Sequence, residues 1–173
     1  MGMKKFVLGL LAVSIFACKS DFEDYDPIKQ LELDTQRIDE FLDANEIDAQ
    51  IDESGIRYVI LDKGNGQYPI EGQVVAVDYE LWRFTGDLVD TSKELLAISE
   101  GIHTPQREYV PLEFELGAVN YIPGFQLSVM LLDENGEGDF YVPSVLAYKN
   151  AGTQNVGANE NLYMKIRLVE IVD

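Results

Sequence analysis

Alternating apolar and polar positions along the chain predict strands with one buried face. Residues 75–81 place apolar side chains at every second position, and residues 112–116 and 162–169 repeat this alternation. Successive side chains of a strand point to opposite sides, so such a segment buries one side against a core. Residues 56–61 form a β-type run that ends in the turn residues 63–66. We therefore expect an antiparallel sheet.

Two other segments show helical spacing. Phe125, Val129 and Leu132 recur at intervals of four and three residues, which predicts a helix over residues 124–132. A looser pattern predicts an amphipathic helix over residues 35–44, and Asp34 and Thr35 are residue types that cap a helix start. A sheet wrapped around one short helix, with an N-terminal amphipathic helix before it, is an α+β fold.

The first seventeen residues have the pattern of a secretory signal peptide. Lys4 and Lys5 precede an apolar run over residues 6–17, which is too short to span about 30 Å of hydrocarbon. The run ends at Cys18 in a context that resembles a bacterial lipobox, and this cysteine is the only one, which excludes an internal disulfide. We expect Cys18 to be acylated and to anchor the mature chain to a membrane. An ordinary signal peptide with an incidental cysteine is the alternative.

The segment after Cys18 is acidic and lacks a hydrophobic period. Residues 19–26 fit a solvated tether, and they also resemble the surface-export signals of Bacteroidota lipoproteins; both interpretations stay open. The chain thus divides into a signal peptide (1–17), a lipidated acidic tether with a helical segment (18–53), and a folded domain (54–173).

The net charge limits the class of partner. The chain carries 31 acidic and 13 basic residues, a formal charge of −18 at pH 7. A phosphate backbone is repelled by such a surface, so nucleic acid is excluded as an expected partner.

Six short motifs occur in a specific order between residues 77 and 170. They are Val77-Asp78-Tyr79, the segment 88–92, the segment 111–117, Tyr121-Ile122-Pro123-Gly124-Phe125, the pair Val142-Pro143 with Leu146-Ala147-Tyr148, and Asn159 with the strand 162–170. Each motif is weak alone, but together and in this order they resemble the FK506-binding-protein (FKBP) type of peptidyl-prolyl isomerase domain over residues 54–173. The acylated cysteine and preceding helix also resemble FKBP-like lipoproteins of Bacteroidota, some associated with gliding or protein secretion.

The resemblance implies roles for individual residues. Tyr79 and Asp90 supply the polar edge of an apolar pocket, Phe125 its floor, Ile122 a backbone N–H for the substrate carbonyl, and Tyr148 a hydroxyl for the peptide. The implied substrate-binding wall consists of Val89, Leu112, Phe114, Tyr121 and Met164. Taken one at a time, these apolar residues would belong to the core of any β protein. The polar Tyr79 and Asp90 carry more weight, because an Asp in an apolar strand needs a hydrogen-bond partner or a function.

The chain departs from the family pattern in the pocket wall and in one loop. Phe125 stands where the family often has tryptophan, and Val89, Leu112 and Met164 stand where aromatic residues are common. Residues 93–110 form an insert that is longer than in compact members, and its apolar stretch 95–98 suits a helical flap or a partner patch.

These features favour an exported isomerase and folding helper in the cell envelope, anchored at the outer membrane and acting on Xaa-Pro bonds of proline-containing polypeptides without a cofactor. The alternative is an FKBP-fold binding module with weak or no isomerase activity, in which the insert or the N-terminal helix docks to a membrane or secretion complex.

Two further segments suggest chemistry that the residues do not support. Residues 133–139 imitate the start of a calcium loop, but its twelfth position is Ser144 and not a glutamate, so we interpret the segment as a turn. His103 is the only histidine and lies in a predicted loop. We expect a surface role for it and no metal site.

Overall fold

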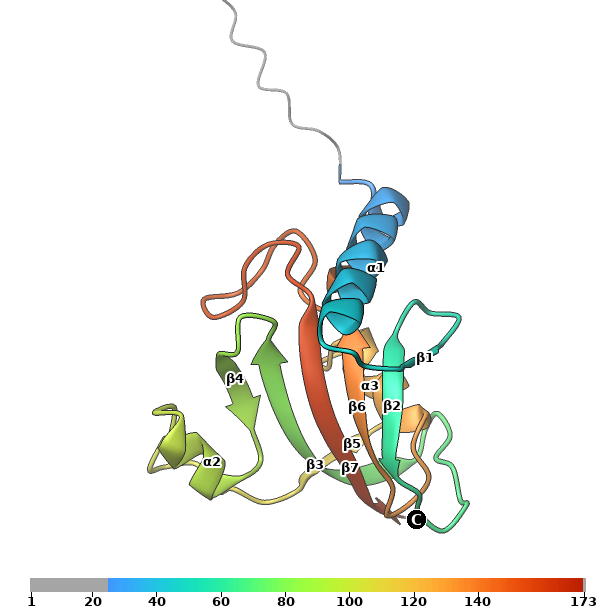
Figure 1. Cartoon of the computed structure of the whole chain (residues 1–173). Helices are drawn as coiled ribbons and strands as arrows, with labels where there is room; N and C mark the ends of the chain where they lie inside the picture. Colours follow the sequence, from blue (N-terminus) through green and yellow to red (C-terminus); the bar gives the residue numbers. More distant parts are fainter. Residues whose placement is uncertain (1–24, 173) are drawn as a thin grey trace, which may run out of the picture.

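The computed structural model describes residues 25–172, which form an antiparallel sheet with a helix on each face (Figure 1). In chain order the elements are α1 (Pro27–Ala44), β1 (Gln50–Ile51), β2 (Arg57–Asp62), β3 (Val74–Arg83), β4 (Leu88–Thr91), α2 (Glu94–Ser99), β5 (Leu112–Glu115), α3 (Pro123–Met130), β6 (Glu137–Val142), the 3₁₀ turn η1 (Ser144–Leu146) and β7 (Leu162–Val172). The sheet order is β1-β2-β6-β7-β3-β4, and β5 pairs with β3. The predicted α+β fold is confirmed.

Strands β3 and β7 form the centre of the sheet, and their alternation decides which face holds the core. They pair antiparallel over nearly their whole length, with Val77 opposite Leu168 and Leu81 opposite Met164. The side chains at alternate positions, Val75, Val77, Tyr79 and Leu81 on β3 and Leu162, Met164, Ile166 and Leu168 on β7, are buried in one cluster. This is the face that α3 covers. The alternation in the sequence therefore predicted both strands and their buried side.

Helix α3 approaches the sheet closely because its second residue has no side chain. The helix begins at Pro123, ends at Met130 and buries Phe125 and Val129. A Cβ on Gly124 would lie 2.3 Å from Cγ1 of Val142 on β6. The predicted helix is thus confirmed, although it ends two residues early; Leu132 is buried in the turn that follows.

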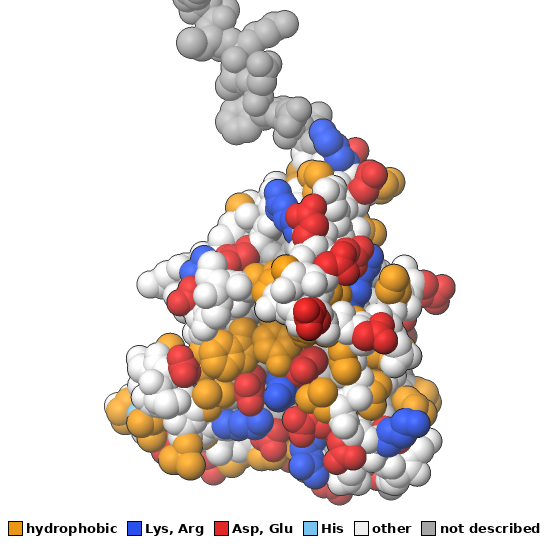
Figure 2. Space-filling model, in the orientation of Figure 1, with side chains coloured by type: hydrophobic (Ala, Val, Ile, Leu, Met, Phe, Trp, Pro, Cys, Tyr) orange, Lys and Arg blue, Asp and Glu red, His pale blue; other side chains and the backbone are white. Residues whose placement is uncertain are grey.

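Helix α1 packs on the opposite face of the sheet. Its Ile38 and Leu42 form a second core cluster with Tyr141, and its Phe41 lies 4.6 Å from the ring of Phe84. On this side of the molecule, hydrophobic side chains gather next to α1 and charged side chains of both signs surround them (Figure 2). The helix is therefore part of the folded body.

The predicted start of this helix was wrong. The helix begins at Pro27, and the side chain of Asp26 caps it by accepting hydrogen bonds from the N–H groups of Ile28 and Lys29, at 2.9 and 3.2 Å. Asp34 is not a cap: it lies within the helix, is fully buried, and accepts a hydrogen bond from the Ser144 hydroxyl. A distant partner satisfies this polar residue, and the local sequence does not reveal such a partner.

Residues 133–136 form the predicted turn, whereas residues 137–139 already belong to β6. The Asp133 carboxylate accepts the backbone N–H groups of Gly64 and Gly66, at 2.9 and 2.8 Å. The hydrogen bond from Gly64 is the main reason why the pKa of Asp133 is lowered. Asp133 thus holds the loop after β2 in place.

The predicted signal peptide and the predicted acylation site, Cys18, lie outside the described residues. Within residues 25–172, the helices are too short or too polar to cross a bilayer. The same range contains no group of three or more His, Cys, Asp or Glu side chains placed to hold a metal ion.

Candidate active site

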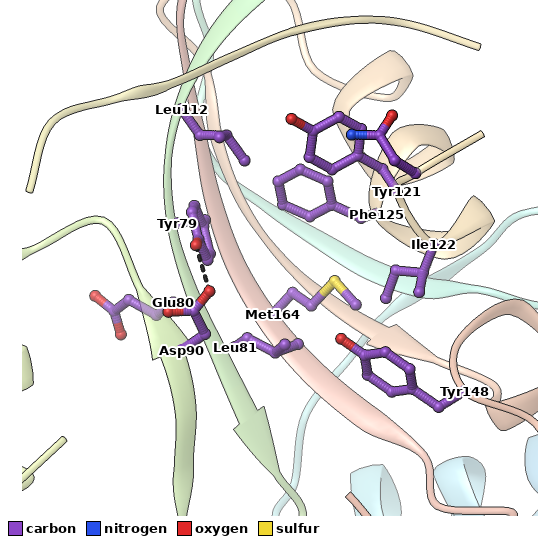
Figure 3. A pocket seen from close by; sticks show the side chains of 11 residues that line it. Tyr79, Glu80, Leu81, Asp90, Leu112, Tyr121, Ile122, Phe125, Tyr148 and Met164 are labelled. Carbon is purple, nitrogen blue, oxygen red and sulfur yellow. Dashed lines mark hydrogen bonds between the residues drawn. The ribbon is translucent and has the colours of Figure 1, made fainter. Parts of the chain in front are cut away.

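A cavity of about 180 Å³ opens between β3, β4, the start of α3 and the segment that follows η1 (Figure 3). Its lining residues are Tyr79, Glu80, Leu81, Asp90, Leu112, Asn120, Tyr121, Ile122, Phe125, Tyr148 and Met164. Most of these side chains are apolar or aromatic. The cavity therefore suits a small apolar group such as a prolyl ring, held by a few polar contacts at its edge.

Aromatic rings form the floor of the cavity. Phe125 is 7% exposed and meets the ring of Tyr79 edge-on, with centroids 5.5 Å apart and planes at 75°. Phe114 lies 5.4 Å from Phe125 and 4.6 Å from the ring of Tyr121. Contacts between aromatic rings at these distances add to the free energy gained from burying the rings. The four rings therefore pack as one cluster at the floor.

Tyr79 and Asp90 form the polar edge. They lie on β3 and β4, whose pairing places Asp90 opposite Leu81. The Tyr79 hydroxyl donates to Oδ2 of Asp90 at 2.6 Å, and the N–H of Thr91 donates to Oδ1 at 2.9 Å. Burial, with the Asp90 carboxylate adding to it, raises the pKa of Tyr79 well above its ordinary value. Tyr79 therefore remains a neutral hydrogen-bond donor at any physiological pH.

Arg107 completes this edge from the insert between β4 and β5. Its Nη1 donates to Oδ1 of Asp90, and its Nη2 donates to the Tyr79 hydroxyl at 3.0 Å. Its guanidinium also lies 5.0 Å from the centre of the Tyr109 ring. The sequence analysis missed Arg107, because an arginine in a long polar insert has no periodicity or spacing that would indicate which distant carboxylate it meets.

Two polar groups at the cavity have no acceptor of their own within residues 25–172. Ile122 is the N-cap residue of α3, and its backbone N–H donates none of the hydrogen bonds in the described part of the chain. The Tyr148 hydroxyl likewise takes part in none of the side-chain hydrogen bonds there, and burial raises the pKa of this hydroxyl, with a smaller contribution from the charge of Asp90. Tyr148 faces Tyr79 and Asp90 from across the cavity (Figure 3). Both groups line the cavity with a hydrogen-bond donor that no residue in the described part of the chain accepts.

The structure brings most of the predicted site residues together. All five residues expected to act on the substrate, Tyr79, Asp90, Ile122, Phe125 and Tyr148, line this one cavity, as do the predicted wall residues Leu112, Tyr121 and Met164. Phe114 lies beneath the floor, where it supports Phe125. Val89 lines a neighbouring groove together with Arg107.

Three lining residues were not singled out from the sequence: Glu80, Leu81 and Asn120. Leu81 had a usable signal, because it lies on the same strand face as Tyr79. The sequence pattern contained no comparable signal for Glu80 or Asn120.

The insert beside the cavity contains a short helix over the stretch 95–98, for which the sequence left a helical flap or a partner patch open. Helix α2 covers Glu94–Ser99 and exposes Leu95 by 82% and Ile98 by 53%. His103 lies in the loop after it, half-buried, with its ring stacked 5.3 Å from that of Tyr109 and its Nε2 atom 3.3 Å from Glu94. His103 thus shapes the insert that carries Arg107.

Comparison with known proteins places this geometry in a family. Residues 66–169 match the family described as FKBP-type peptidyl-prolyl cis-trans isomerase. A probable FKBP-type isomerase, FkpA, from Neisseria meningitidis is 36% identical over 119 residues, which cover 68% of this chain and 38% of that protein. The outer membrane protein MIP of Legionella longbeachae is 29% identical over 147 residues, which cover 83% of this chain and 56% of MIP.

Solved structures show the same fold at lower identity. The crystal structure of FkpA from Escherichia coli has a TM-score of 0.62 at 21% identity, covering 84% of this chain and 62% of that one. A peptidyl-prolyl isomerase from Pseudomonas syringae has a TM-score of 0.61 at 19% identity, covering 87% and 98%. The chain spans about half the length, or less, of the curated relatives described above. Since the family match covers more than half of the chain, including β3, α3 and the cavity between them, this chain belongs to the FKBP-type peptidyl-prolyl cis-trans isomerase family.

Proposed function

We propose that this chain catalyses the cis–trans isomerisation of Xaa-Pro bonds in exported polypeptides and so assists their folding. The observation that carries the proposal is the cavity itself, an apolar pocket floored by Phe125 with the Tyr79–Asp90 pair on one side. On the other side lie two donors that have no acceptor among residues 25–172, the Ile122 N–H and the Tyr148 hydroxyl. Family membership and the relatives named above support it.

The reaction asks for a particular environment. Rotation about a peptide bond crosses a barrier of about 18–20 kcal/mol, and uncatalysed prolyl isomerisation takes roughly 10–100 s at 25 °C. The twisted amide at the barrier has lost its resonance and with it part of the charge separation that water stabilises. A site that excludes water therefore favours the twisted form over either planar form. No proton transfer and no covalent intermediate are needed.

Each polar group has a role in that process. The prolyl ring lies on Phe125 and displaces water from the cavity. The Ile122 N–H binds a substrate carbonyl and fixes one side of the bond, while the Tyr148 hydroxyl donates to the peptide on the other side of the proline. Asp90, held by Tyr79 and Arg107, presents a fixed polar wall to the rotating amide. Lowering the barrier by 1.4 kcal/mol accelerates rotation about tenfold.

An isomerisation assay on a short Xaa-Pro peptide tests the proposal. The wild-type chain should accelerate the reaction above the rate in buffer, and Asp90→Ala and Phe125→Ala should each reduce kcat/KM by about tenfold or more, as expected for loss of a group worth roughly 1.4 kcal/mol. Glu113→Ala, an exposed residue on β5, is the matched control and should leave the rate unchanged. If the wild-type chain binds proline peptides but does not raise the isomerisation rate above that in buffer, the chain is a binding module and not an enzyme.

We also propose that Cys18 carries a lipid and places the domain in the cell envelope, at the outer membrane. The short apolar run before Cys18 and the absence of any other cysteine support this assignment, as does the similarity to a relative named as an outer membrane protein. Incorporation of labelled palmitate into the wild-type chain, and none into Cys18→Ala, is the expected result. Equal labelling of both would contradict it.

We further propose that the chain is a lipoprotein similar to those of Bacteroidota. In this proposal it takes part in an envelope assembly for gliding or secretion. The acidic segment 19–26 behind Cys18 supports surface display. Protease added to intact cells should then cleave the chain, and it should spare a variant in which residues 19–24 are replaced by neutral residues. Equal protection of both forms would favour a periplasmic location.

A further inference from the structure

Asp34 on α1 is a fully buried carboxylate that the proposed reaction does not use. It is 0% exposed. Its Oδ1 accepts a hydrogen bond from the Gln30 amide at 2.7 Å, and its Oδ2 accepts one from the Ser144 hydroxyl at 2.6 Å. Burying a carboxylate is costly unless hydrogen bonds replace the lost water. The hydrogen bond between Asp34 and Ser144 therefore holds helix α1 against η1.

A second set of hydrogen bonds closes the cluster. The side-chain amide of Asn161, the residue before β7, donates to the backbone carbonyl of Asp34 at 2.9 Å, and its oxygen accepts the N–H of Ser144 at 3.0 Å. Ser144 is 0% and Asn161 is 7% exposed. Helix α1, the turn η1 and the residue that leads into β7 thus meet in one buried polar cluster. A satisfied buried network of this kind specifies a single arrangement of its members.

Ser144 connects this cluster to the cavity. Its backbone carbonyl accepts the N–H groups of Ala147 at 3.0 Å and Lys149 at 2.9 Å, the two residues that flank Tyr148. The carbonyl of Lys149 in turn accepts the N–H of Asn159 at 2.8 Å, which closes the base of the loop that leads to Asn161. The position of Tyr148 at the cavity wall therefore depends on where Ser144 is held.

We propose that Asp34 is a positioning residue for the cavity: through Ser144, helix α1 fixes the segment that presents Tyr148 to the substrate. This inference rests on the proposed isomerase function and extends the site to a helix that lies on the far side of the sheet. Helix α1 then contributes to peptide binding, and a change in how the helix packs on the sheet alters the affinity for the peptide.

The test compares Asp34→Ala with a matched variant of the same helix. Asp39→Ala also removes a contact between α1 and the body, the ion pair with Arg57 at 2.8 Å, but it touches neither Ser144 nor the cavity. In the full chain, Asp34→Ala should weaken binding of an Xaa-Pro peptide about tenfold, with kcat/KM falling by a similar factor. Asp39→Ala should stay within twofold of wild type. Asp34→Asn keeps an acceptor for the Ser144 hydroxyl and should restore most of the binding.

A double-mutant cycle separates positioning from a general loss of stability. In a Tyr148→Ala background, Asp34→Ala should have little further effect on peptide affinity, because the residue it positions is gone. The NMR signals of the Tyr148 ring should shift in Asp34→Ala and not in Asp39→Ala. Equal losses of affinity in both backgrounds, or an unmoved Tyr148 ring, would overturn the inference.

These experiments also distinguish a failure of the Asp34 inference from a failure of the proposed isomerase function. If the wild-type chain lacks isomerase activity, the proposed function fails, and peptide affinity and the Tyr148 signals still decide the role of Asp34. If Asp34→Ala does not fold, Ser144→Ala removes only the hydroxyl that Asp34 binds and carries the same comparisons. An affinity of folded Ser144→Ala equal to that of wild type would then overturn the inference.

Discussion

Substitution of Gly124 by alanine tests the close contact between α3 and the sheet. Gly124 is buried at the second position of α3, and it does not have a positive φ, so an alanine fits the backbone itself. The added Cβ would lie 2.3 Å from Cγ1 of Val142 and 3.1 Å from the carbonyl oxygen of Leu146. Val142 is 0% exposed and β-branched, so it has no free space into which to rotate.

Two effects of known size oppose each other in Gly124→Ala. Alanine is more favourable than glycine inside a helix by about 1 kcal/mol. Overpacking a core costs typically about 1–3 kcal/mol, and a separation of 2.3 Å is far below the optimum of about 3.5–4.0 Å for two carbon atoms. The clash should prevail, with a net loss of up to about 2 kcal/mol in the free energy of unfolding.

The functional effect should be larger than the loss of stability suggests. Relief of the clash moves α3 away from β6, and α3 carries both the Phe125 floor and the Ile122 N–H. Misplacement of a catalytic group by about 1 Å can cost roughly a hundredfold in rate. We expect kcat/KM to fall by at least tenfold under conditions where the variant is fully folded.

Urea denaturation and the Xaa-Pro peptide assay measure these two effects. Gly157→Ala is the control, because its Cβ would meet only the carboxylate of Glu160, at 3.1 Å, and no core side chain. Val142→Ala removes the obstructing methyl groups, so the double variant should be more stable than the sum of the two single changes predicts. An increase of about 1 kcal/mol in the stability of Gly124→Ala, the value expected from helix propensity alone, would refute the reasoning.

Three further changes have defined outcomes. Arg107→Ala should lower kcat/KM severalfold but change stability by less than about 1 kcal/mol, because its ion pair with Asp90 is more than a third exposed; an unchanged rate in the peptide assay would contradict its place at the edge. Asp39→Ala leaves Arg57, whose side chain is 10% exposed, without its carboxylate, and urea denaturation should show a loss of about 1–2 kcal/mol; a loss below 0.3 kcal/mol would contradict this ion pair. Burial raises the pKa values of Tyr25, Tyr79, Tyr141 (to about 12), Tyr148 and Tyr163. Folding favours their protonated forms, so their contribution to stability is complete below the ordinary pKa near 10 and is lost as the pH rises above it. Denaturation midpoints that stay constant between pH 9 and 11.5 would contradict this prediction.

The local pattern of the sequence determined most of the strands and the central helix. Alternation over residues 75–81 and 162–169 reports which side chains avoid water, and a strand has only two faces, so the buried side of β3 and β7 followed directly. The same reasoning placed Phe125 and Val129 on the buried side of α3. The resemblance to the FKBP family, which rested on the order of the short motifs, implied that Tyr79, Asp90 and Tyr148 would share a cavity, and they line the same one.

Only the tertiary structure decided the polar contacts that complete the site. Asp34 resembled a helix cap because aspartate is a capping residue type, yet its partner Ser144 lies 110 residues away. Arg107 meets Tyr79 across 28 residues of chain that include most of the insert. Periodicity records whether a position faces water or core, and it is read from residues two apart in a strand and three or four apart in a helix. A buried hydrogen bond depends on which segments the folded chain brings together, so its partners could be identified only from the structure.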